Sequence, residues 1–318
     1  MENWGVMPKK KSMRRKPRLG KNLHSTWSPL CEGDIVDLVA PGFAPKLLEI
    51  RAARNYIRSL GLRPRLPQDL VGNDVLCSNS DEKRFSFLKQ ALLDRKSKAI
   101  WCLRGGYGAN RLLPYLQELK APDHAKVVVG YSDVTSLHLF LNQVWKWNTL
   151  HGPLLDRFAR GEGRPRDEKE LLDCLFGVKT RLEYRELRPL NKLAAGRGQL
   201  GGSITGGNLT TWVSAIGTPW AGQAKGRILF FEDIGEQARK VDRMLVQIQQ
   251  SGGFQGVKAV ILGDFVGGAE SNGSFQWKKV LRRFAEESNF PVFHRFPLGH
   301  GQKQRPLPFG PKAVLRKG

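Results

Sequence analysis

The feature that most constrains the fold of this chain is a regular alternation of short apolar runs and helical patterns, which begins near residue 33. The runs Asp34–Ala40, Ala99–Leu103 and Lys126–Val129 are short and rich in aliphatic residues, as in strands buried on both faces. Segments with helical spacing of apolar residues follow, such as Pro45–Leu60 and Asp133–Trp145. This order predicts an α/β fold with a parallel, Rossmann- or flavodoxin-like sheet covered by helices on both faces.

The rest of the chain predicts a second unit of the same class. A length of 318 residues corresponds to about two domains. The stretch 157–169 is polar and charged, and it is interpreted as a linker or the start of a crossover. We therefore expect a disordered arm at 1–22, an N-terminal domain at 23–160, a linker at 161–195 and a smaller C-terminal α/β domain at 196–318. The remaining predicted elements are strands at 62–66, 227–231, 257–262 and 291–293, and helices at 80–93, 110–119, 236–250 and 275–287.

Net charge is the unusual part of the composition. The chain has 52 lysines and arginines against 29 acids, a net charge of +23. Residues 1–22 carry eight of the basic residues and one acid, and residues 295–318 carry six and no acid. The arm is therefore interpreted either as a solvated tail or as a tether to an anionic polymer or membrane. No zinc-finger or RNP-type signature accompanies it, so nucleic-acid binding through the tails is kept only as a nonspecific alternative.

The spacing of the cysteines and the lack of long apolar runs indicate the cellular location of the protein. Cys31, Cys77, Cys102 and Cys174 lie too far apart for a C-x-x-C pair, which is typical of reduced thiols. No apolar run approaches the ~18–20 residues of a membrane span. The basic arm is not followed by the apolar segment of a standard secretory signal. We expect a cytoplasmic protein without an integral membrane segment, although export by another route stays open.

A serine lies at the first candidate site, where the run Val127–Val129 leads into Gly130, Tyr131 and Ser132 and then directly into a helix. This is the context of a nucleophile elbow, in which a serine is exposed above the strand ends. The helix start also offers backbone N–H groups to an anion. The strict G-x-S-x-G string is not met, and on this motif alone the interpretation of Ser132 as an N-cap is the favoured one.

Two further segments follow predicted strands. Arg104–Gly108 (RGGYG) is neither a dinucleotide fingerprint nor a Walker A loop, so a glycine N–H facing an oxyanion and a simple tight turn both stay open. Phe231–Gly235 (FEDIG) places two carboxylates after a strand, where one acid can orient a histidine. Asp233 and Glu236 fit helix capping as well, whereas Glu232 is the acid that capping explains least.

A serine nucleophile also needs a base, and none of the six histidines identifies itself alone. His300 lies between two glycines, which let its backbone approach a site closely, and His151 follows a short apolar stretch. The other histidines are His24, His124, His138 and His294.

Taken together, these segments resemble the LD-carboxypeptidase family of serine peptidases, which includes murein tetrapeptide carboxypeptidases and microcin C immunity hydrolases. The resemblance runs from about Ser28 to Leu315, and it depends on the order and spacing of several modest motifs. These motifs are Arg104–Gly108, Gly130–Asp133, His151–Pro153, Gly206–Thr210, Phe231–Gly235, Asp242–Leu245 and Gly299–His300.

The resemblance implies a Ser-His-Glu triad assembled from both domains, with Ser132 as nucleophile, His300 as base and Glu232 as orienting acid. It implies an oxyanion hole made by the backbone N–H groups of Gly106 and Asp133. It also implies a homodimer that needs no metal or cofactor.

By the same resemblance, the substrate is a murein tetrapeptide stem cut before its terminal D-alanine. Arg104, Tyr107 and Asn208 are the candidate substrate-binding residues, and Arg104 is a candidate to hold a carboxylate. The alternative substrate is a peptidyl- or aminoacyl-nucleotide amide, as in microcin immunity. The spacing of the sequence does not decide between His300 and His151 as the base.

Overall fold

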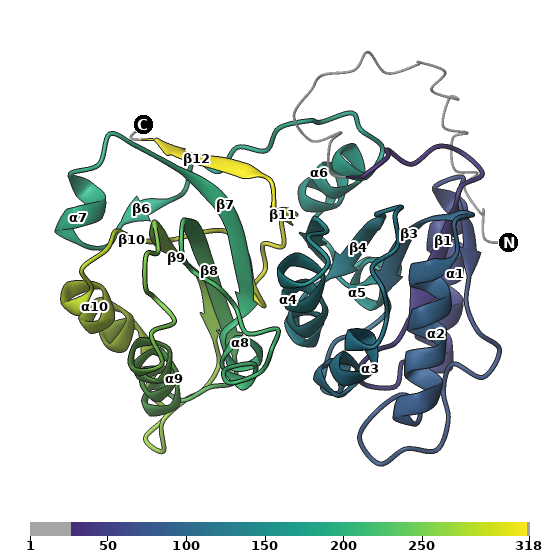
Figure 1. Ribbon diagram of the computed structural model, residues 1–318, viewed down its shortest axis with the longest axis horizontal. Helices are drawn as coiled ribbons and strands as arrows, with labels where there is room; N and C mark the ends of the chain where they lie inside the picture. The colour runs from purple at the N-terminus through teal and green to yellow at the C-terminus, as the bar shows by residue number, and fades with distance from the viewer. Residues whose placement is uncertain (1–26, 317–318) are drawn as a thin grey trace, which may run out of the picture.

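The computed structural model describes residues 27–316, and it places them around two six-stranded sheets (Figure 1). The predicted basic arm at 1–22 lies outside the described residues, as does His24. The first sheet has the strand order β11-β5-β4-β3-β1-β2, in which β1 to β5 run parallel and β11 is antiparallel to β5. Its strands are β1 (Ile35–Val39), β2 (Arg63–Arg65), β3 (Ser97–Cys102), β4 (Val127–Gly130), β5 (Thr149–His151) and β11 (Leu307–Phe309).

The second sheet has the order β12-β7-β8-β9-β10-β6. Its four central strands run parallel, and β12 and β6 pair antiparallel at the two edges. The predicted α/β class with parallel sheets is thus confirmed. The strands are β6 (Arg188–Pro189), β7 (Gln199–Asn208), β8 (Arg227–Ile234), β9 (Ala259–Val266), β10 (Val292–His294) and β12 (Lys312–Arg316).

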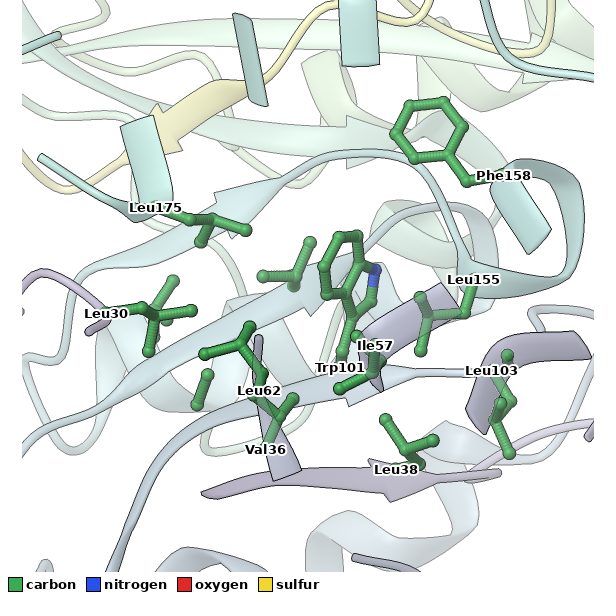
Figure 2. Packing of buried hydrophobic residues seen from close by; sticks show 14 of the residues in the cluster. Leu30, Val36, Leu38, Ile57, Leu62, Trp101, Leu103, Leu155, Phe158 and Leu175 are labelled. Atoms are coloured by element: carbon green, nitrogen blue, oxygen red, sulfur yellow. The ribbon is translucent and has the colours of Figure 1, made fainter. Parts of the chain in front are cut away.

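Helices cover both faces of the first sheet because its strands are apolar on both sides. In β4, for example, every residue is buried. Figure 2 shows one of the resulting cores, in which Trp101 of β3 lies among Ile57 of α1, Leu155 of α5 and Leu175 of α6. The helices of this half are α1 (Leu47–Ser59), α2 (Asp81–Leu93), η1 (Ala109–Leu112), α3 (Leu113–Gln117), η2 (Ser132–Val134), α4 (Thr135–Gln143), α5 (Leu155–Ala159) and α6 (Pro165–Leu175).

Helix α4 lies between the two sheets, against β5 on one side and β7 on the other (Figure 1). All nine of its residues are buried, including the polar Thr135, Ser136, His138, Asn142 and Gln143, so no face of this helix is exposed to solvent. Close approach needs a small residue on the facing strand, because a Cβ at Gly207 would lie 2.4 Å from the Thr135 hydroxyl. The helices of the second half are α7 (Lys192–Ala195), α8 (Leu209–Ser214), α9 (Ala238–Gln250) and α10 (Trp277–Glu287).

Three sequence expectations differ from the structure. The expected linker contains helix α6, because Leu171 and Leu175 lie one turn apart and pack into the core of the first sheet. The expected helix at 110–119 begins as a 3₁₀ turn and continues as a short α-helix whose first turn contains Pro114, which lacks a backbone donor. Strand β11 joins the first sheet, although it lies within the expected C-terminal domain.

The other predicted elements agree with the structure to within a few residues. Ser80 caps α2 by accepting a hydrogen bond from the Lys83 backbone, as its position predicted. Gly61 follows α1 with φ +77°, the left-handed conformation expected of a glycine after a helix. Strand β8 extends to Ile234, past the predicted end at Phe231, so that Glu232 and Asp233 lie inside a strand. No helix within residues 27–316 has the length and apolar character to cross a membrane.

Candidate active site

Ser132 lies in a strained turn between β4 and α4. Its φ is +65°, a left-handed conformation that a serine rarely adopts. The turn also needs Gly130, because a Cβ there would lie 2.8 Å from the Val134 side chain. The residue preceding η2 is Tyr131, and no side chain caps this turn. The capping interpretation of Ser132 is therefore wrong, and its hydroxyl is directed elsewhere.

That hydroxyl meets His300, which comes from the loop between β10 and β11. The Nε2 atom of His300 is 3.1 Å from the Ser132 Oγ, and its Nδ1 atom is 2.6 Å from a carboxylate oxygen of Glu232. Glu232 is fully buried in β8 and His300 is mostly buried. Three side chains from two sheets, 168 and 68 residues apart in sequence, thus form one hydrogen-bonded chain.

The glycine before His300 explains how its loop reaches the sheet. Gly299 has φ +129°, and a Cβ there would lie 3.0 Å from Glu232. A side chain at this position would push the loop away from the carboxylate.

His151, the alternative base, is placed differently. It is buried among Tyr131, Phe230 and Phe309, with ring centroids 5.2 to 5.8 Å apart. Burial holds the pKa of His151 well below its usual value, so its imidazole is neutral. His300, and not His151, makes the hydrogen bond to Ser132 among the described residues.

The expected oxyanion residues lie around the same serine. A Cβ at Gly105 would be 3.3 Å from the Ser132 Oγ, so the glycine loop passes close to the hydroxyl. The next residue, Gly106, has φ +100° and packs so tightly on Phe43 that a Cβ would overlap the ring. The Asp133 carboxylate accepts a hydrogen bond of 2.9 Å from the Ala109 backbone, and burial raises its pKa to about 6. This bond ties the serine turn to the segment after the glycine loop.

The three candidate substrate-binding residues have different surroundings. Arg104 is partly exposed and lies 3.6 Å from Glu49, so its charge is already partly compensated. Tyr107 is 40% exposed. Asn208 is buried and caps α8: its oxygen accepts from the Thr211 backbone, and its amide donates to Asp233 at 2.8 Å. The structure gives Asn208 a structural role next to the site.

The acids of the FEDIG segment separate into two kinds. Asp233 accepts hydrogen bonds from Asn208 and from the backbone and hydroxyl of Thr210, so it supports the start of α8. Burial and the neighbouring charge of Glu232 raise the pKa of Asp233. Glu236 forms an ion pair with Lys240 one turn along. Glu232 alone faces the histidine.

Sequence reasoning missed Asp264, Tyr131 and Gln304. Asp264 lies in β9 beside β8, and a Cβ at Gly301 would lie 2.3 Å from its carboxylate. Burial, and then the charge of Glu232, raise the pKa of Asp264 to about 6. The Tyr131 ring lies 4.7 Å from the ring of His300, and its hydroxyl accepts a hydrogen bond from Gln304. Asp264 and Tyr131 each had a signal in the sequence, namely a place just past the end of a predicted strand, whereas Gln304 had none.

Most of the chain is similar to known carboxypeptidases. Residues 36–152 match the N-terminal domain and residues 201–315 the C-terminal domain of the LD-carboxypeptidase family. A putative carboxypeptidase of Rickettsia prowazekii is 39% identical over 78% of this chain and 77% of its own. The murein tetrapeptide carboxypeptidase of Pseudomonas aeruginosa is 29% identical over 91% of this chain and 95% of its own.

The fold is also similar to that of solved structures. The muramoyltetrapeptide carboxypeptidase of Oxalobacter formigenes is 26% identical, with a TM-score of 0.74 over 89% of this chain and 95% of its own. An MccF-like protein of Bacillus anthracis has a TM-score of 0.76 over 91% of this chain and 95% of its own, at 21% identity. That second likeness concerns the fold alone.

Proposed function

The chain belongs to the LD-carboxypeptidase family of serine carboxypeptidases, and from that premise we propose that it removes the terminal D-alanine from murein tetrapeptides. The observation that carries the proposal is the hydrogen-bonded chain from Ser132 through His300 to Glu232. Two relatives with this activity in their names match nearly the whole chain and support the substrate class.

In the proposed reaction, the Ser132 Oγ attacks the carbonyl carbon of the last peptide bond while His300 takes the hydroxyl proton. Glu232 accepts a hydrogen bond from the Nδ1–H of His300, which fixes the tautomer that leaves Nε2 free to act as a base. The carbonyl oxygen becomes an oxyanion, and the Gly106 and Asp133 backbone N–H groups are proposed to donate to it. One such donor contributes about 10²–10³-fold in rate.

Collapse of this intermediate breaks the C–N bond, and His300 returns its proton to the departing amine of D-alanine. The acyl group then remains on Ser132 as an ester. A water molecule attacks the acyl carbon of that ester while His300 takes a proton from the water. The bond from the acyl carbon to the Ser132 Oγ then breaks, and His300 gives its proton to the Oγ, which releases the tripeptide and restores the serine hydroxyl.

Murein stems carry several carboxylates, and basic residues near the site would attract them. Arg104 and Tyr107 lie on the glycine loop beside the serine and stay the proposed substrate contacts. Asn208 is proposed to contribute through the position of Glu232, since the two residues pair in register on β7 and β8.

Location and assembly are also proposals. Four cysteines occur, and none of them forms a disulfide within residues 27–316, which supports a reducing compartment such as the cytoplasm. The homodimer and the contact of the basic arm with anionic polymers stay predictions from the family resemblance and from the charge. Because the chain belongs to an enzyme family, we do not propose nucleic-acid binding as its main function.

The test is release of D-alanine from a purified murein tetrapeptide. We expect release by the wild-type protein and a loss of roughly 10⁶-fold in kcat for Ser132→Ala, whose hydroxyl is absent. Circular dichroism and thermal unfolding check that the variant is folded. Full activity of Ser132→Ala would overturn the triad.

A parallel assay with a peptidyl-nucleotide amide separates the two substrate classes. Hydrolysis of that amide, with no release of D-alanine from the tetrapeptide, would favour the immunity-type alternative.

A further inference from the structure

The loop that carries His300 continues into a set of buried contacts with helix α6. After His300 the chain runs through Gln304 and Arg305 before it enters β11. Gln304 and Arg305 are both buried, although they lie in a coil segment. Buried polar residues in a coil need partners, and here the partners belong to an element packed on the first sheet.

Gln304 is held at both its backbone and its side chain. Its backbone N–H donates to the Asp167 carboxylate of α6 at 2.9 Å. Its side-chain amide donates to the Tyr131 hydroxyl at 2.9 Å and to the Gly299 carbonyl at 3.4 Å. Gln304 therefore connects α6 to the residues directly before His300 and directly before Ser132.

Arg305 forms a bidentate ion pair with Glu170, one turn along α6 from Asp167. The two N–O distances are 2.5 and 2.9 Å, and both side chains are buried. The guanidinium also lies 4.2 Å from the ring of Tyr184 and donates to the Glu183 carbonyl. A buried, bidentate pair of this kind fixes direction as well as distance.

Helix α6 is itself fixed to the first sheet. Leu171 and Leu175 on its apolar side are buried in the core that contains Trp101. The helix thus offers a rigid support on the side of the molecule that holds Ser132, while the loop it contacts starts from the second sheet.

We propose that α6 positions the catalytic base: Asp167 and Glu170, acting through Gln304 and Arg305, hold His300 at the Ser132 hydroxyl. We call these four residues the α6 clamp. The inference rests on the proposed function, because it concerns the base of that reaction. None of the four residues touches Ser132, so they are positioning residues. They act across the two sheets and join the nucleophile and the base as one unit.

The clamp predicts a specific kinetic effect. A base displaced by about 1 Å costs up to about 10²-fold in rate, whereas substrate contacts made by other residues are unaffected. In Glu170→Gln and Arg305→Lys, which break the bidentate pair, we expect kcat to fall by about 10- to 100-fold with KM within about twofold of wild type.

A second readout does not depend on the substrate. A fluorophosphonate probe forms a bond from the Ser132 Oγ to phosphorus and expels fluoride, while His300 takes the proton. Its labelling rate should fall in parallel with kcat in both clamp variants. Lys169→Gln on the same helix is the matched control, because Lys169 is exposed and pairs only with Asp173 among the described residues. It should keep wild-type values.

Removing one partner of a buried ion pair also lowers stability, so unfolding must be followed alongside. All rates are compared at a temperature at which each variant is folded. Tyr131→Phe is the milder variant: it keeps the ring beside His300 and loses only the hydroxyl that receives Gln304. It should lower kcat and the labelling rate to a smaller extent.

Wild-type kcat and labelling in folded Glu170→Gln, Arg305→Lys and Tyr131→Phe would overturn the clamp, as would a rise in KM with unchanged kcat. Failure of the proposed function looks different. In that case wild-type protein itself releases no D-alanine, or Ser132→Ala is labelled as fast as wild type.

Discussion

Ser132 and His300 meet in one hydrogen bond, but the chain holds them in different ways. The serine is fixed by local backbone geometry: Gly130, a left-handed φ and a helix that begins at once. His300 lies in a coil between β10 and β11 and has no regular structure of its own. It is held by distant partners, namely Glu232 in β8 and the α6 clamp.

The difference shows how a site between two sheets can be kept rigid. A strained turn fixes one reacting atom mainly through its own backbone geometry, at a cost of about 1–3 kcal/mol in backbone strain. The second atom can then be aligned to it by long-range contacts. A change at the serine turn should therefore act locally, whereas changes far from His300 should reach it.

The largest expected effect tests whether the histidine that meets the serine is the base. His300→Ala should lower kcat by roughly 10⁶-fold, as loss of the base does in a serine peptidase triad. His151→Phe should keep most of the activity, because an aromatic ring can fill the space among Tyr131, Phe230 and Phe309. D-alanine release by the two variants measures this. A large loss of activity in His151→Phe together with near wild-type activity in His300→Ala would make His151 the base, and the long-range contacts of His300 would then have no catalytic role.

A smaller effect tests the support beneath the serine turn. His138 of α4 lies 2.9 Å from the Gly130 carbonyl through Nε2, and burial lowers its pKa to about 4. An unfolded chain binds this proton near pH 6.5, so the neutral histidine stabilises the fold above that pH and this contribution is lost as the pH falls toward 4.

In His138→Gln, which cannot be protonated, this loss should be absent. Between pH 7 and 4.5 the free energy of unfolding should therefore fall by about 2–3 kcal/mol more in wild type than in the variant. Urea unfolding at the two pH values measures the difference. Equal falls would show that burial in the fold does not lower the pKa of His138.

The smallest expected effect concerns the strain at the nucleophile. Ser132→Gly should be more stable than Ser132→Ala by about 1 kcal/mol, because only glycine adopts φ +65° without steric cost. Neither variant has the hydroxyl, so both should be inactive. The difference between the urea midpoints of the two variants measures the cost of the left-handed backbone at residue 132. Equal midpoints would show that the turn is not strained.

The same contrast explains how far the sequence could predict the site. The strand β4 and Gly130 are local, and their pattern offered a nucleophile turn beside the simpler N-cap interpretation of Ser132. Capping left Glu232 unexplained, and the family resemblance gave it the role of orienting acid. The α6 clamp was not found, since Gln304 and Arg305 lie in a segment without periodicity and their partners are about 135 residues away. Helix α6 itself was hidden by the charged residues on its outer face.

The fold was predictable for a related reason. Buried parallel strands appear in the sequence as short apolar runs, and helices appear as apolar residues at helical spacing, so both can be predicted from local sequence. Most predicted boundaries agreed with the structure to within a few residues. The assignment of β11 to the first sheet was not predictable, because pairing between residues 307–309 and 149–151 depends on the folded path of the whole chain.

That pairing has a consequence for how the protein is made. The sheet that carries the nucleophile exposes the edge of β5 until residues 307–309 emerge from the ribosome, and an unpaired edge strand invites wrong partners. Strand β12 then closes the edge of the other sheet within the next few residues. Synthesis thus delivers the loop with His300 and both edge strands almost together, and after every other strand of the two sheets, so the Ser132–His300–Glu232 chain is completed only once both sheets are otherwise made.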